Sequence, residues 1–365
     1  MANNDFIDEV MGFNPSNLSA FEEPQKASFN DAIYKTNPVT LSKSDDGHYH
    51  AKVRIIYNPF DVKHSIVNQT TYAMNDANGF FMVKSKLADG DRDDVIFKGW
   101  KKLWFSKDDQ EAKREYCKKM FQKTESRWVL VQIIEDDNQP ELVGQFKAWK
   151  LPKDVFEKLQ AKMHPSVESK KVPVALMDYL FGPLLELDVQ PGPDDKTNPG
   201  RKQREISYSL CEFDTDVYPI IRRDGTPLFN ETEVEIVENY DNKRKELAKA
   251  KTDAKKSAIQ EELNGMTDAL RELYGKAISY LKSDEAHVID IVKECGYQPW
   301  TPEVSARVEN WLAIVANMGD PTQEAAPAPQ AVPQTAPEQV GPAANVQAFD
   351  LMAAAMGPGD EEMPF

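Results

Sequence analysis

The last 47 residues of this 365-residue chain cannot belong to a packed domain. Residues 319–365 hold seven acidic residues, eight of the 24 prolines and no Lys or Arg. Such a stretch buries too little apolar surface to offset the conformational entropy that ordering it would cost. We therefore expect a disordered acidic tail, rich in Pro, Ala and Gln, behind a folded body. One apolar island within it, residues 348–356, could become helical on a partner.

Bulk properties place the chain among soluble proteins of a reducing compartment. The mean hydropathy is −0.58, and no apolar run approaches the length of about 18 residues that a membrane span needs. We expect no contact with a membrane and see no signal peptide. Three widely spaced cysteines favour a reducing cytoplasm over a disulfide framework (Cys117, Cys211, Cys295). The net charge of −16 would argue against binding to nucleic acid only if the charges were spread evenly over the protein.

The middle of the chain, residues 37–238, is predicted to be rich in β-structure. The stretch 49–56 alternates apolar and polar residues, as a half-buried strand does. Further strands are predicted at 127–134, 142–149, 184–189 and 205–213, with an acidic turn at 135–141 and a helix starting near Pro152. Several short strands with one inserted helix suit a barrel of the OB type. We expect a mainly β fold with added helices, preceded by an N-terminal arm over residues 1–36.

A helical segment is predicted after this region, over residues 239–318. Apolar residues recur at steps of four and three between Ile259 and Tyr280, which is the pattern of one helix face. The stripe either packs against its own domain or forms a seam for self-association. A shorter helix is predicted from Pro302, with Thr301 as N-cap.

Residues 98–127 combine positive charge with aromatic rings. The segment holds ten basic and five acidic residues, a net charge of +5 in a protein of −16. Single-stranded nucleic acid requires this mixture, because cations neutralise phosphates and flat rings stack on unpaired bases. Lys147 and Trp149 repeat the pairing on one strand face, and a later loop adds Arg201, Lys202 and Arg204. Candidate contacts from the segment and the next residue are Lys98, Trp100, Lys101, Lys102, Trp104, Phe105, Tyr116, Lys118, Lys119, Phe121, Lys123, Arg127 and Trp128. The alternative is that the rings are core and the lysines a solvated face.

The sequence contains no convincing catalytic or metal-binding constellation. His48 and His50 have the spacing of two ligands on one strand face but lack a partner, so we interpret them as surface residues. The acidic run 135–137 lies in a predicted turn and is more typical of a solvated loop. No phosphate-cradling loop and no cysteine pair at zinc spacing is found. We therefore expect a protein that is not an enzyme and needs no cofactor.

The residues from 49 to 213 resemble a known family. Their order is similar to that of the helix-destabilising single-stranded DNA-binding protein of T-even-like tailed phages, most specifically through "EYCKKMFQKTESRWVLVQIIEDDNQPELVGQFKAW". The resemblance implies an OB-fold groove that holds a single strand. It assigns DNA contacts to Arg54, Tyr116, Lys118, Lys119, Lys123, Trp128, Phe146 and Lys147.

Two features of that family are absent from this sequence. The family's zinc subdomain uses one His and three Cys, whereas residues 60–115 contain His64 and no Cys. The resemblance therefore implies no zinc here. The family's basic N-terminal arm, which is linked to cooperative binding, has no counterpart, since the first ten residues hold no Lys or Arg.

The chain ends in "GDEEMPF", which resembles the acidic Pro-Phe tip of bacterial single-stranded DNA-binding proteins. In those proteins the tip docks into enzymes of replication and repair. Such docking would be explained if the terminal Phe ring entered an apolar pocket of the partner and the terminal carboxylate bound an Arg or Lys of it. The preceding acidic residues would then face a basic rim around that pocket. The alternative is a solubilising tail. The predicted partner-binding residues are Asp360, Glu361, Glu362, Met363, Pro364 and Phe365.

These observations together predict a sequence-independent single-stranded DNA-binding protein. It would coat strands during phage DNA replication, recombination and repair in the cytoplasm of a bacterial host, and recruit enzymes through its tip. One alternative is a replisome adaptor or loader with secondary DNA contact. The other is a Mg²⁺-dependent single-strand nuclease, for which residues 135–137 are the local candidate.

Overall fold

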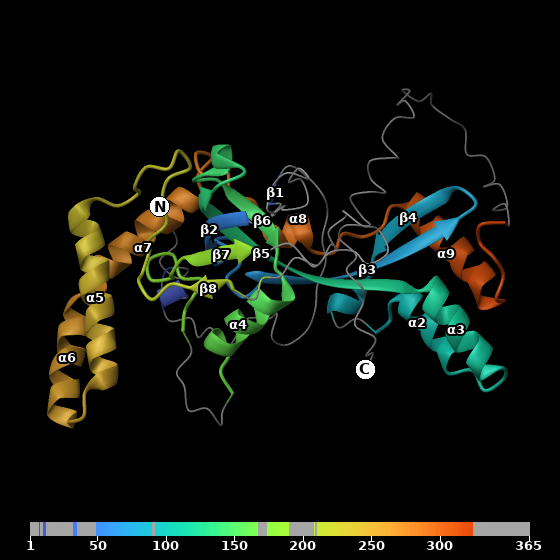
Figure 1. Ribbon diagram of the computed structural model, residues 1–365, viewed down its shortest axis with the longest axis horizontal. Coiled ribbons are helices and arrows are strands. Elements are labelled where there is room, and N and C mark those ends of the chain that lie inside the picture. The colour runs from blue at the N-terminus through green and yellow to red at the C-terminus, as the bar shows by residue number, and fades with distance from the viewer. Residues whose placement is uncertain are drawn as a thin grey trace, which may run out of the picture.

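One mixed sheet runs through the whole molecule. The structure, a computed structural model, describes residues 7, 10–11, 32–34, 49–89, 92–166, 174–189, 208 and 210–323. These residues form eight strands of a single sheet and eight α-helices (Figure 1). The strands are β1 (Ile33–Tyr34), β2 (Tyr49–Ile56), β3 (Ile66–Asp76), β4 (Gly79–Lys84), β5 (Gln122–Asp136), β6 (Phe146–Lys150), β7 (Leu185–Val189) and β8 (Glu212–Phe213).

The helices lie around both ends of this sheet. The α-helices are α2 (Val95–Trp104), α3 (Gln110–Met120), α4 (Lys153–Met163), α5 (Glu231–Lys249), α6 (Asp253–Gly265), α7 (Thr267–Leu281), α8 (Ile291–Cys295) and α9 (Pro302–Ala316). Two short 3₁₀ helices, η4 (Lys86–Asp89) and η5 (Pro140–Leu142), complete the described elements. Within the described residues, more of the chain is helical than is in strands. The sheet with added helices is therefore observed, but the expectation that β-structure predominates is wrong.

Strand β5 organises the sheet because it is 15 residues long. Its C-terminal half pairs with β2, from Leu130 to Asp136, and its N-terminal half pairs with β3, from Gln122 to Val129. The order is β1-β6-β5-β2-β7-β8, with β3 beside β5 and β4 beyond β3. Only β1 runs parallel to its neighbour, β6, among the described strands. The described pairings leave the sheet open, so the closed OB-type barrel expected from the sequence is not observed.

The first hydrophobic core forms around β2, β6, β7 and the C-terminal half of β5. The central β5 residues Val129, Val131 and Ile133 are fully buried in it. Helix α4 contributes Val155 and Leu159, and α7 and α8 close the same core. The strands predicted at 49–56, 127–134 and 184–189, and the helix predicted near Pro152, are therefore confirmed. The strand predicted at 205–213 is found only over Glu212–Phe213.

A second hydrophobic core lies at the other end of β5, where α2, α3 and α9 cover β3 and β4. Trp311 of α9 is buried, donates from Nε1 to the Asn75 carbonyl at 3.0 Å and meets the edge of Phe121. Arg307 clamps the same helix to β3 through two hydrogen bonds to Asp76, of 2.7 and 2.8 Å. Helix α9 begins as predicted, since the Thr301 side chain accepts from the backbone N–H of Val304. Figure 1 shows the long strand β5 running from the strands of the first core to the elements of the second.

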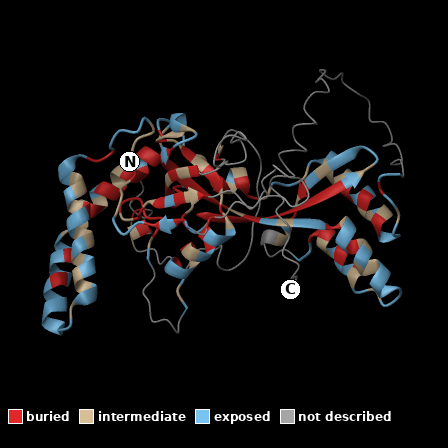
Figure 2. Cartoon of the chain, in the orientation of Figure 1, coloured by how far each residue is buried: buried red, intermediate tan, exposed pale blue. Residues whose placement is uncertain are grey.

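Helices α5 and α6 form an antiparallel hairpin that extends away from the body (Figure 1). A capping box at Asn230 and Glu233 starts α5. Most of the hairpin surface is exposed, as its pale blue colour shows (Figure 2). The apolar stripe predicted between Ile259 and Tyr280 continues through α6 and α7, and most of it is buried within the chain. This burial agrees with the interpretation that the stripe packs on its own domain.

Candidate nucleic-acid interface

The basic and aromatic segment folds into two helices, α2 and α3, and the start of β5. Asp94 caps α2 by accepting from the backbone N–H of Phe97 at 2.9 Å. The apolar face of α2 buries Ile96, Trp100 and Leu103 in the second core. In α3 only Cys117 is buried, so most of this helix faces solvent (Figure 2).

The exposed surface of this segment carries a concentration of positive charge. Seven lysines are exposed on or beside the two helices (Lys98, Lys101, Lys102, Lys107, Lys118, Lys119, Lys123). Three of them pair with acids at 2.7 to 2.8 Å: Lys98 with Asp93, Lys118 with Glu115 and Lys123 with Glu125. The other four form no ion pair with any residue that the structure describes. A phosphate can therefore approach them without first breaking a salt bridge.

The aromatic rings of the segment divide between core and surface. Trp100 and Phe121 are buried in the second core. Trp104 is half-buried, stacks on Trp100 at 5.4 Å between ring centroids and has the Arg114 guanidinium 5.4 Å from its own centroid. Tyr116 is half-buried and donates its hydroxyl to the Gly319 carbonyl at 2.5 Å. Phe105 is 53% exposed, so it is the ring of this segment best placed to meet a base.

Four other predicted contacts lie in the first core. Trp128, Phe146 and Trp149 are all buried there. Arg54 has no exposed surface, and its guanidinium donates to the carbonyls of Tyr218, Ile55, Leu176 and Asp178. Burial also lowers the pKa of this guanidinium to about 10. A group that is buried and bonded in this way serves the fold, so the sequence-based assignment of Arg54 and these rings to a strand-binding surface is not supported by their positions.

The remaining predicted contacts have three different settings. Arg127 is half-buried, with its guanidinium 4.1 Å from the centroid of the Phe156 ring, and burial lowers its pKa. Lys147 is half-buried and lines a pocket at the edge of the first core. The loop residues Arg201, Lys202 and Arg204, and the tip residues Asp360, Glu361, Glu362, Met363, Pro364 and Phe365, lie outside the described residues.

A further surface, not anticipated from the sequence, lies on the face of β3 and β4 opposite to the second core. Phe80 and Met82 project from this face and are 44% and 37% exposed, whereas Val83 points into the core. Further along β3, Gln69 pairs with β5 instead, and its side chain accepts hydrogen bonds from Ser126 and, at 3.1 Å, from the Trp128 indole. The available signal was the short apolar run 80–83, which is typical of a strand but does not show which of its faces is exposed.

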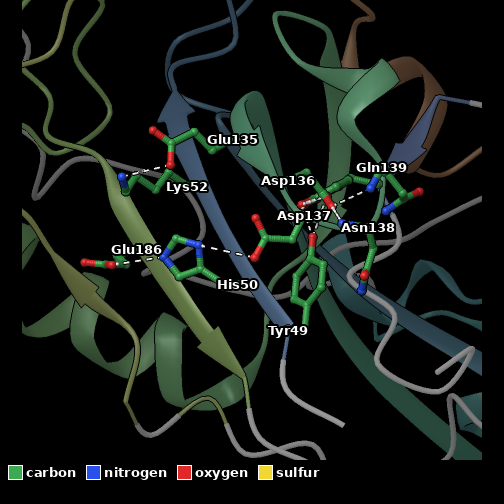
Figure 3. A network of polar contacts seen from close by, with 10 residues as sticks. Tyr49, His50, Lys52, Glu135, Asp136, Asp137, Asn138, Gln139 and Glu186 are labelled. Carbon is green, nitrogen blue, oxygen red and sulfur yellow. Dashed lines mark hydrogen bonds and ion pairs between the residues drawn. The ribbon is translucent and has the colours of Figure 1, made fainter. Parts of the chain in front are cut away.

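The acidic run 135–137 does not form a metal site. Glu135 pairs with Lys52 at 2.8 Å, while Asp137 lies 3.9 Å from His50, whose other ring nitrogen is 3.0 Å from Glu186 (Figure 3). Asp136 is buried and accepts hydrogen bonds of 2.5 Å from the hydroxyls of Tyr34 and Tyr49. The three carboxylates thus engage separate partners rather than one centre.

The Asp136 network is a structural feature of the sheet. The same carboxylate accepts from the backbone N–H groups of Asn138 and Gln139, which shapes the turn after β5 (Figure 3). Burial raises the pKa of both Tyr34 and Tyr49, so their phenols stay protonated donors. The network fixes β1 to the sheet and leaves no free carboxylate for chemistry.

Neither a metal-binding cluster in the described residues nor a match to a known protein identifies this chain. Within the described residues, no three His, Cys, Asp or Glu side chains gather closely enough to hold a metal ion. Among the described helices, none has the length and apolar character that crossing a membrane requires. No protein-family model matches the chain, and no curated protein matches it.

Proposed function

We propose that this protein binds single-stranded DNA without regard to sequence and recruits partner enzymes through its acidic C-terminal tip. The observation that carries the proposal is the exposed lysine surface of α2 and α3. Four of its lysines have no ion-pair partner in the described chain (Lys101, Lys102, Lys107, Lys119). The protein as a whole carries a net charge of −16, so this local concentration of positive charge is the part of the described surface that would attract a polyanion.

The aromatic part of the interface is smaller than the sequence suggested. Phe105 supplies an exposed ring beside the lysines, and Trp104 adds a half-buried one. Stacking of one base on one ring contributes roughly 1–3 kcal/mol and tolerates any base. Phosphate contacts would therefore provide most of the affinity, and one or two stacked bases would position the strand.

The place where the described chain ends supports the proposed role of the acidic tail. The described chain leaves α9 beside α3, where Gly319 accepts from Tyr116 and Asp320 lies close enough to Lys119 to be influenced by its charge. The described chain thus approaches the basic surface shortly before residue 324, where the acidic sequence of the tail begins. We infer that the tail competes with DNA for the lysines, and that a bound strand releases the tip for its partners.

A second candidate function is a replisome adaptor with secondary DNA contact. It is favoured by the α5–α6 hairpin, which extends from the body and buries only Val237, Ile259 and Leu263 among its residues (Figure 1). An exposed hairpin of this kind offers a surface to a protein partner. The two candidates differ in whether DNA binding depends on the α2–α3 lysines.

The test is a titration of the full chain with oligo(dT) and with a duplex of the same length at 50 and 200 mM salt. Four phosphate contacts to a single strand give a slope of log K against log salt of about −2.8. We expect oligo(dT) to bind with at least this slope, and a variant ending at Gln323 to bind more tightly at low salt. A flat salt response, or a preference for duplex, would refute single-strand binding and leave the adaptor as the better candidate.

A further inference from the structure

A small pocket lies at the edge of the first core, away from the α2–α3 surface. Its volume is about 220 Å³. Its walls come from β6, from the residue before β1, from the loop at Arg223 and from the segment between α7 and α8, with Ala32, Gln145, Phe146, Lys147, Arg223, Ala286, His287 and Ile289 as the lining residues. Strands β1 and β6 and helix α8 lie close together at this place (Figure 1).

The lining of the pocket is basic. Lys147, Arg223 and His287 belong to it, and none of the described lining residues is acidic. The side chains of Arg223 and His287 form no hydrogen bond or ion pair with the residues that the structure describes. Glu285, the acid closest to His287 in sequence, is already paired with Arg222 at 3.0 Å. Arg223 and His287 therefore line the pocket without a side-chain partner among the described residues.

The backbone that carries Arg223 is held firmly. Tyr280 accepts a 2.6 Å hydrogen bond from the Arg223 N–H, and the Arg222 N–H donates to the Thr226 carbonyl across the turn. Gly144 has a positive φ of 82° and packs so closely on the Arg223 carbonyl that a Cβ there would clash. The turn at Gly144 and the turn at Arg223 thus pack tightly against each other, which fixes the position of the Arg223 backbone. Such preorganisation lowers the entropy cost of holding a ligand.

The backbone at His287 is also unusual. Its φ of 48° is in the left-handed region, which residues other than glycine rarely adopt. Conformations of this kind persist where the surroundings impose them, and they concentrate at binding sites. The strained residue is one of the three basic residues of the pocket, and this is evidence independent of the charge.

We propose that this pocket binds a phosphoryl group. Two side chains that can donate several hydrogen bonds and a histidine match the oxygens of a phosphate. Phe146 and Ile289 add apolar surface to the lining, and a less polar environment strengthens a charged contact. The phosphoryl group has three possible sources, namely free phosphate, the terminal phosphate of a strand and an internal phosphodiester. The proposal does not depend on the coating of DNA by the α2–α3 surface.

The test uses calorimetric titration of the full chain with inorganic phosphate, and anisotropy with two oligo(dT) probes of equal length, one ending in a 5′-phosphate and one in a 5′-hydroxyl. The variants are Arg223→Gln and His287→Gln. Lys251→Gln, in the loop between α5 and α6, is the matched control. Removing one charged donor should weaken phosphate binding by at least about tenfold, whereas the control should bind as the wild type does.

Each outcome of this test has a defined meaning. A loss of the advantage of the 5′-phosphate in Arg223→Gln identifies a terminal phosphate as the ligand, and an equal loss for both probes identifies a phosphodiester. A loss confined to inorganic phosphate identifies a small anion. If phosphate and both probes bind wild type and variants equally, the proposal is wrong even though single-strand binding stands. If phosphate binds but neither probe does, single-strand binding fails and the pocket remains.

Discussion

The lysines without partners on α2 and α3 allow a quantitative prediction. Replacing Lys101, Lys102, Lys107 and Lys119 by Gln removes four exposed cations that form no ion pair in the described chain. Because no salt bridge is lost, the variant should fold as stably as the wild type. Each phosphate contact to a single strand contributes about 0.7 to the slope of log K against log salt. The slope should therefore become shallower by about 2.8.

The same arithmetic gives the change in affinity. Over a fourfold rise in salt, each contact contributes a factor of about 2.6, so four contacts contribute about 50-fold. The variant should lose that part of the salt dependence, measured by anisotropy of labelled oligo(dT) between 50 and 200 mM salt. The control removes four lysines near the tip of the α5–α6 hairpin (Lys249, Lys251, Lys255, Lys256). It changes the net charge equally, although Lys255 and Lys256 pair with Glu246 and Asp253 at the surface.

The comparison between the two variants decides the question. A shallower slope in the α2–α3 variant alone places the strand on that surface. Equal changes in both would show that net charge acts at long range, and an unchanged slope in the α2–α3 variant would refute the interface.

Three further predictions concern the fold that supports these sites. Arg307→Ala should lower the free energy of unfolding by roughly 1–3 kcal/mol at pH 7, measured in urea, because it breaks the clamp on Asp76. The hydrogen bond from Arg307 lowers the pKa of Asp76, so the ion-pair part of this stabilisation is present above about pH 4 and is lost as the pH falls further. Arg307 also contacts the Phe81 ring and the Gly79 carbonyl, so a smaller difference remains in acid; a difference that does not shrink between pH 7 and pH 2 would contradict the prediction. Gly182→Ala should destabilise by at least about 2 kcal/mol, because a Cβ would clash with the Arg54 guanidinium and lie 2.5 Å from the Leu176 carbonyl; an unchanged melting temperature would show that the Arg54 cluster can relax. The thiols should react with a disulfide reagent only after denaturation, since burial raises the pKa to about 11 for two of them and about 12 for the third (Cys117, Cys211, Cys295); fast reaction of the native protein would exclude this packing.

Local patterns in the sequence predicted much of the secondary structure. The alternation at 49–56 gave β2, and the Thr301-Pro302 pair gave the start of α9 with its cap. Both signals act over a few residues, through side-chain periodicity and through satisfaction of the first backbone N–H groups. The concentration of charge in 98–127 was equally visible, because charge counts need no coordinates. The sequence did not show that the sheet would stay open, because closure depends on strand pairings between distant segments.

Only the tertiary structure determines which aromatic rings are buried and which are exposed. Trp100 and Trp104 stand one turn apart on α2 with similar neighbours in sequence, yet Trp100 is buried and Trp104 is half-buried. The helix that accounts for the difference is α9, about 200 residues later, whose Trp311 and Val308 complete the second core. In the same way Lys147 meets Arg223 and His287 only because β6 and two later loops converge. The sequence by itself determined which residues carry charge and rings, and packing between distant segments decided which of them can reach a ligand.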